Sequence, residues 1–87
     1  MSNERLKSLK IMGKVKYPFV IYPAVEGGYV AEIPALKGCL AQGETLNETL
    51  EELEMVESLW LETAQQTGLE LPQVEVEIER VKQKLAA

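Results

Sequence analysis

Cysteine and glutamate are among the side chains in this 87-residue sequence whose types could do acid–base, nucleophilic or metal chemistry. The sequence has no His and no Asp. This excludes Ser-His-Asp and Cys-His nucleophile pairs, proton transfer through imidazole, and zinc sites built from clustered His and Cys. The single cysteine, Cys39, has Lys37 as its nearby basic residue, and we interpret it as a buried structural thiol. We therefore expect no enzyme, no metal site and no cofactor.

The charges are divided between two segments of the chain, within a net charge of −5. Residues 1–16 carry five basic side chains against Glu4 alone, a balance of +4, whereas residues 44–62 carry seven glutamates and no basic residue, a balance of −7. An acidic segment repels phosphate and attracts basic protein surfaces. It therefore favours a basic protein partner over nucleic acid, and the alternative is an ordinary solvated helix face.

The first half of the sequence predicts a β-hairpin followed by a third strand. We expect residues 1–13 to be an arm or short helix, and residues 15–24, rich in β-branched and aromatic side chains, to be a strand. A turn at 26–28 leads to a returning strand at 29–33, and a loop at 34–38 leads to a short strand at 39–42. The structural turn residues predicted here are Gly27, Gly28, Gly38 and Gly43.

A long helix follows, and its start is marked by a capping box formed by Thr45 and Glu48. Its apolar stripe through Leu53, Val56 and Trp60 predicts the core face, and Gly68 predicts its end. Two apolar residues, Met55 and Leu59, instead fall on the glutamate-rich side that we expect to face solvent. They are either isolated exposed residues or contacts with another chain. The candidate partner interface comprises Tyr29, Glu32, Glu51, Glu54, Met55, Leu59 and Glu62.

The tail, residues 72–87, fits two structures. Val74, Val76 and Ile78 alternate as in a strand, whereas Val74, Ile78, Val81 and Leu85 have helical spacing. We expect a strand to about Ile78 and a helical end. The tail is too short for a separate DNA-binding domain, so DNA binding by this chain alone is not expected.

These elements predict one α+β domain, with a three- or four-stranded sheet and one long helix packed on it. The first strand is apolar on both faces, but one helix covers one face only. The uncovered face predicts a homo-oligomer, a dimer or a dimer of dimers, with Val20, Tyr22 and Val30 as the candidate interface. The longest uncharged stretch is far shorter than the roughly 20 residues of a membrane helix, so we expect a cytoplasmic protein without membrane association.

The ordered series of segments resembles HicB-type antitoxins. The matching segments are 17–21 (YPFVI), 26–31 (EGGYVA), 33–34 (IP), 36–39 (LKGC), 41–45 (AQGET) and the helix from Glu51 to Trp60. The resemblance implies a β-β-β-α-β core over residues 15–71, similar to a truncated ribonuclease H fold without nuclease chemistry. It also implies that the chain neutralises a HicA-like toxin, a small basic mRNA-cleaving protein, by masking its active site.

Two other functions stay open at this point. One is an orphan oligomeric ribonuclease H-like domain of different function, and the other is a metal-dependent nuclease that uses glutamates. A ribonuclease H site needs a carboxylate on its first strand, and residues 15–24 contain none. The sequence therefore favours binding over catalysis.

Overall fold

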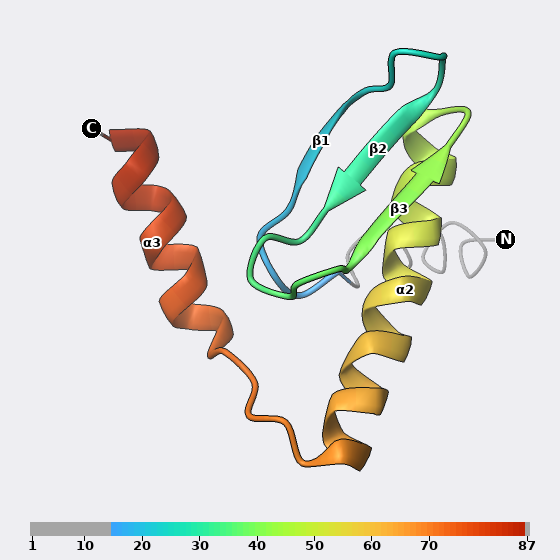
Figure 1. Cartoon of the computed structure of the whole chain (residues 1–87). Helices are drawn as coiled ribbons and strands as arrows, with labels where there is room; N and C mark the ends of the chain where they lie inside the picture. The colour runs from blue at the N-terminus through green and yellow to red at the C-terminus, as the bar shows by residue number, and fades with distance from the viewer. Residues whose placement is uncertain (1–14, 87) are drawn as a thin grey trace, which may run out of the picture.

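A computed structural model describes residues 15–86, so the arm or helix expected at residues 1–13 lies outside the described residues. The described chain is an α+β fold, as predicted (Figure 1). Its elements follow in the order β1 (Val20–Pro23), β2 (Tyr29–Glu32), β3 (Leu40–Gly43), α2 (Leu46–Thr67) and α3 (Val74–Ala86). Within residues 15–86, neither helix combines the length and the apolar character that a membrane crossing requires.

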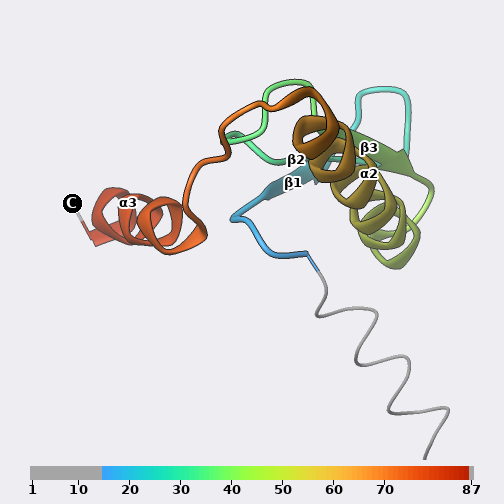
Figure 2. The same cartoon turned by 90° about the horizontal axis from the view of Figure 1, so that it is seen from below.

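The three strands form an antiparallel sheet in the order β1-β2-β3. Its register places Ile21, Ala31 and Ala41 side by side on one face. Helix α2 packs across β2 and β3 on this face (Figure 2), where Ala31 and Ala41 are buried. Small side chains at these two positions bring the helix close to the strands. The remaining core is supplied by Tyr17, Ile33, Leu36, Cys39 and Leu53.

Strand β1 is shorter than the predicted strand over residues 15–24, because the segment before it has a different backbone partner. The backbone N–H groups of Lys16 and Tyr17 donate to the side chain of Glu57 on α2 rather than to a neighbouring strand. Pro18 follows and has no N–H to offer to a sheet. Only residues 20–23 pair with β2.

The expectation that the helix glutamates face solvent is wrong for Glu57. This residue is 2% exposed, and its two oxygens accept three backbone hydrogen bonds of 3.0–3.1 Å from Lys16 and Tyr17. A buried carboxylate is tolerated when it is hydrogen-bonded in this way. Glu57 therefore joins the entry segment to the middle of α2.

Two of the predicted turn glycines are required by close backbone contacts. A Cβ at Gly28, which has φ +77°, would lie 2.5 Å from the carbonyl oxygen of Gly43. A Cβ at Gly43 would lie 2.7 Å from both the backbone nitrogen and Oγ1 of Thr49. Only glycine at these positions lets the hairpin, β3 and the first turn of α2 pack together.

The predicted helix ends are confirmed. The Thr45 hydroxyl accepts a 3.1 Å hydrogen bond from the Glu48 backbone N–H. The Glu48 carboxylate in turn accepts from the N–H of Glu44, one residue before the cap. Gly68 ends the helix in the left-handed conformation, with the N–H of Leu69 donating to the Ala64 carbonyl at 2.9 Å.

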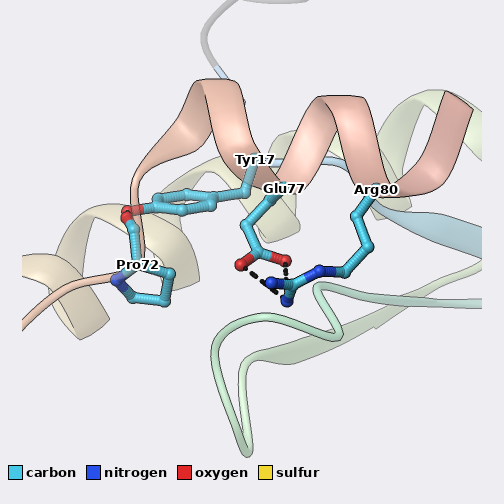
Figure 3. A network of polar contacts seen from close by, with 4 residues as sticks. All are labelled: Tyr17, Pro72, Glu77 and Arg80. Atoms are coloured by element: carbon cyan, nitrogen blue, oxygen red, sulfur yellow. Dashed lines mark hydrogen bonds and ion pairs between the residues drawn. The ribbon is translucent and has the colours of Figure 1, made fainter. Parts of the chain in front are cut away.

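The strand predicted at 74–78 is wrong, because the tail is the helix α3. The helical spacing, seen at Val74, Ile78, Val81 and Leu85, therefore predicts this segment better than the strand-like alternation does. Val76 lies exposed on the opposite side of the helix. The tail is anchored where the Tyr17 hydroxyl donates a 2.5 Å hydrogen bond to the Pro72 carbonyl (Figure 3). One helical turn is further supported by the Glu77–Arg80 ion pair at 3.2 Å.

Two ionisable side chains in the core favour their neutral forms. Burial raises the pKa of Tyr17 above 10.0, and the negative charges of Glu57, Glu77 and Glu75 add to this shift. Burial likewise raises the pKa of the Cys39 thiol above 9.0, with a smaller contribution from Glu57. Ionisation of either group therefore lowers the stability of the fold.

We expect Glu57→Ala to lower the free energy of unfolding by about 3 kcal/mol, because it leaves buried N–H groups without an acceptor. Glu57→Gln keeps one acceptor oxygen and should cost about half as much. Urea unfolding followed by circular dichroism measures both effects. Glu51→Gln, on the exposed side of the same helix, serves as the control and should change stability little. Equal stability of Glu57→Ala and wild type would contradict the structural role of this carboxylate.

Gly43→Ala should destabilise the domain by about 1–3 kcal/mol, because the added methyl group meets Thr49. Gly38→Ala is the matched variant: its Cβ meets nothing within 4 Å, so only the strain of its positive φ remains, about 1 kcal/mol. Thermal unfolding should rank Gly38→Ala above Gly43→Ala in stability. The reverse order would be inconsistent with the close approach of β3 to α2.

Stability should fall in alkaline solution. The raised pKa values of Cys39 and Tyr17 mean that their contribution is complete below the unfolded-state values near 9.0 and 10.0. It is lost as the pH rises through the folded-state values. Urea unfolding between neutral pH and pH about 11 should show this decline. Cys39→Ala should remove the part that begins near pH 9.0, and a decline unchanged in that variant would show that the thiol does not contribute.

Candidate functional site

The side of α2 that points away from the sheet carries both acidic and apolar side chains. Glu51, Met55, Leu59 and Glu62 follow one another there at helical spacing, and we call these four residues the outer face of α2. Met55 is 57% exposed and Leu59 is 61% exposed. Four of the residues expected at a partner interface therefore share one solvent-facing surface.

An apolar groove of about 450 Å³ lies beside the outer face. We call it the α2 groove, and its lining residues are Val56, Leu59, Trp60, Thr63, Ala64, Thr67 and Leu69. The Trp60 ring is held in place because its Nε1–H donates a 3.0 Å hydrogen bond to the Lys37 carbonyl. Leu59 belongs to both the groove and the outer face, so the two form a continuous surface.

The groove is a feature that the sequence analysis missed. Val56 and Trp60 were assigned to the core, and both do pack against it. Both are only half-buried, however, and their remaining surface lines the groove. Val56, Thr63 and Thr67 follow one another at helical spacing beside the predicted stripe, and this second row is the signal in the sequence that could have indicated the groove.

The other residues of the predicted partner interface lie elsewhere. Glu54 is half-buried on the opposite flank of α2. Tyr29 lines a hollow of about 480 Å³ between the hairpin and the first turns of α2, together with Glu44, Glu48 and Glu52. Glu32 lies on the sheet face that α2 does not cover. Its carboxylate accepts a hydrogen bond from the Tyr22 hydroxyl, and this bond raises the pKa of Tyr22.

The residues of the candidate oligomer interface share that uncovered sheet face. The strand register places Glu32 between Val20 and Leu40, and places Val30 between Tyr22 and Gln42. We call the four apolar residues of this surface, Val20, Tyr22, Val30 and Leu40, the open face of the sheet. Val20, Tyr22 and Leu40 are exposed and Val30 is half-buried.

Two side chains of reactive types, Cys39 and Glu57, are buried in the fold. Cys39 is 1% exposed, and its raised pKa keeps the thiol protonated near neutral pH. The Glu57 carboxylate is occupied by backbone N–H groups. No three carboxylate or thiol side chains within residues 15–86 are grouped so that they could hold a metal ion.

Comparison with known proteins places the chain in a family. The UPF0150-like family model matches residues 12–72. The chain is similar to UPF0150 protein ssl0259 of Synechocystis sp., with 64% identity over 73 residues, which are 84% of this chain and 100% of that protein. It is also similar to UPF0150 protein Ta0767 of Thermoplasma acidophilum, with 31% identity over 58 residues, 67% of this chain and 84% of that protein.

A solved structure shares the fold. The crystal structure of TTHA0281 from Thermus thermophilus matches with a TM-score of 0.62 and covers 84% of this chain and 88% of that one. Its 23% sequence identity supports a common fold only. The family model spans β1 through the end of α2, the part of the chain that carries the sheet, the outer face and the α2 groove. The chain is therefore a member of the UPF0150-like family.

Proposed function

We propose that this protein is a non-catalytic, antitoxin-like binding protein that docks on a small basic mRNA-cleaving toxin of the HicA type and covers its active site. The observation that carries the proposal is the outer face of α2, where exposed Met55 and Leu59 lie between Glu51 and Glu62. The resemblance of the hairpin and helix segments to HicB-type antitoxins supplies the class of partner.

The surface suits a basic protein in two ways. Glutamates near the outer face give it a negative field, which speeds encounter with a positively charged partner. The exposed Met55 and Leu59 and the α2 groove then offer apolar area that the partner can bury. A toxin that binds mRNA must itself be basic where it contacts phosphate. A surface that attracts basic protein therefore fits the part of such a toxin that has to be masked.

Masking requires no chemistry from the binding protein. The proposal therefore agrees with a buried, protonated Cys39 thiol and with a first strand that has no carboxylate. A metal-dependent nuclease would need carboxylates that converge. The glutamates described in residues 15–86 offer no such group, so the geometry gives that alternative no support.

We expect the protein to form a stable complex with a HicA-type toxin, for which the product of the adjacent reading frame is the candidate to test, and to stop its RNA cleavage. Glu51→Lys/Glu62→Lys should slow association roughly tenfold at low ionic strength, because it reverses charges that attract the toxin. Met55→Ala/Leu59→Ala should speed dissociation by a similar factor, because it removes buried apolar contacts. Stopped-flow or surface-binding kinetics separate the two rates.

The matched control is Glu26→Lys/Glu70→Lys, which makes the same charge change at exposed glutamates of the hairpin turn and the loop after α2. Its association rate should stay closer to that of wild type than the rate of the outer-face variant. The absence of a complex, with RNA cleavage continuing at full rate, would refute the antitoxin function. A complex that both charge variants slow equally would place the binding surface away from the outer face.

A further inference from the structure

We propose that two copies of this chain form a dimer by exchanging α3, so that the apolar stripe of each α3 packs on the open face of the other copy's sheet. The stripe consists of Ile78, Val81 and Leu85. This inference goes beyond the proposed function, because it concerns the sheet face and the tail and leaves the outer face of α2 free for a partner.

Within residues 15–86, helix α3 is packed only lightly. None of its residues is buried, and it approaches neither α2 nor any strand closely. In both views it stands beside the sheet, past β1, rather than over it (Figures 1 and 2). An isolated helix of 13 residues is only marginally stable in water, so most of its stability must come from packing.

Val74, Ile78, Val81 and Leu85 lie on one side of α3, but residues 15–73 cover only the beginning of that side. Val74 packs against the core. Ile78 and Val81 border a shallow pocket of about 350 Å³ whose other walls include Tyr17 and Phe19. Leu85, one turn further on, is 82% exposed. The stripe therefore continues past the end of the surface that the described part of its own chain provides.

The open face of the sheet likewise has apolar side chains that lack a covering element in the described chain. Val20 is 49% exposed and Leu40 is 46% exposed, on a face that no helix of the described chain covers. The α3 of the same chain stands beside β1 rather than over this face (Figures 1 and 2), and the hydrogen bond from Tyr17 to Pro72 holds the start of the tail (Figure 3). In a dimer with a two-fold axis, the α3 stripe of each copy covers the open face of the other copy's sheet. Both apolar surfaces are then buried.

The charges favour the same occupant. The strand register places one acidic side chain, Glu32, on this face of the described sheet. The glutamates of α3 lie in its first half, at positions 75, 77 and 79, whereas residues 80–86 carry only basic charges. Of these basic residues, Lys82 borders the same pocket as Ile78 and Val81. A helix docked through this stripe therefore brings basic side chains toward Glu32 of the second copy. Apolar area and charge both match between the two surfaces.

Sedimentation velocity over a concentration series tests the exchange. Wild type should sediment as a dimer. Val81→Glu/Leu85→Glu puts two carboxylates into the stripe and should raise the dimer dissociation constant by roughly a hundredfold or more. The matched control, Val76→Glu/Gln83→Glu, adds the same charge to the opposite side of α3 and should leave the dissociation constant within a few-fold of wild type. Circular dichroism confirms that each variant is folded.

A mixing experiment distinguishes exchange from other dimers. Leu40→Glu disrupts the open face and should be monomeric, whereas Val25→Glu, at the fully exposed hairpin tip, should remain a dimer. An equimolar mixture of the Leu40→Glu chain with the Val81→Glu/Leu85→Glu chain retains one intact helix-on-sheet contact. It should form dimers at concentrations where each variant alone is monomeric.

Three results would overturn the proposal. The first is a wild type that is monomeric at every concentration. The second is a dimer that resists the stripe substitutions or is weakened as much by the control pair. The third is a mixture in which neither variant rescues the other, which is the result expected of a dimer joined sheet to sheet. Toxin binding is measured separately, so failure of the dimer leaves the proposed function standing.

Discussion

The carboxylate of Glu57 determines how the rest of the domain is arranged. It accepts three backbone hydrogen bonds from Lys16 and Tyr17, residues about 40 positions earlier in the chain. Charge-assisted bonds of this kind are stronger than neutral ones, and the low exposure of Glu57 prevents water from competing for them. The segment before β1 is thereby held against the middle of α2. This contact replaces the first part of the strand that the sequence predicts.

The position of Tyr17 then fixes the tail. With its backbone held by Glu57, the Tyr17 side chain is buried in the core and its hydroxyl reaches the Pro72 carbonyl. The chain after α2 is therefore attached near the start of β1, and α3 begins at that edge of the sheet. The arrangement leaves two amphipathic surfaces without partners in the described chain, the outer face of α2 and the open face of the sheet. The proposed toxin complex and the proposed dimer each use one of them.

Local signals made most of the fold predictable from the sequence. The capping box at Thr45 and the glycine at position 68 mark the ends of α2, because both depend on neighbouring backbone groups alone. The hairpin follows from its glycines and flanking β-branched residues. The apolar alternation on both faces of the first strand also indicated the open face. These features need no information about distant parts of the chain.

Features that depend on tertiary contacts were not predictable in the same way. Glu57 lies between Leu53 and Trp60 on the core stripe, so its periodicity indicated burial while its charge indicated exposure. The outcome depended on backbone donors about 40 residues away. Val74, Val76 and Ile78 fitted a strand locally, but the described sheet ends at three strands and the tail is helical. Tyr29 and Glu32 were grouped with the helix glutamates, although the fold places them on different surfaces.

Hydrogen–deuterium exchange of the protein with and without its cognate toxin is the most direct test of the central claim, that α2 presents the binding surface. The account predicts that toxin slows exchange of the α2 backbone amides from Glu51 to Thr63, with little change on β1. Exchange slowed in β1 and β3 but unchanged in α2 would show that the toxin binds the open face of the sheet, and would contradict the account.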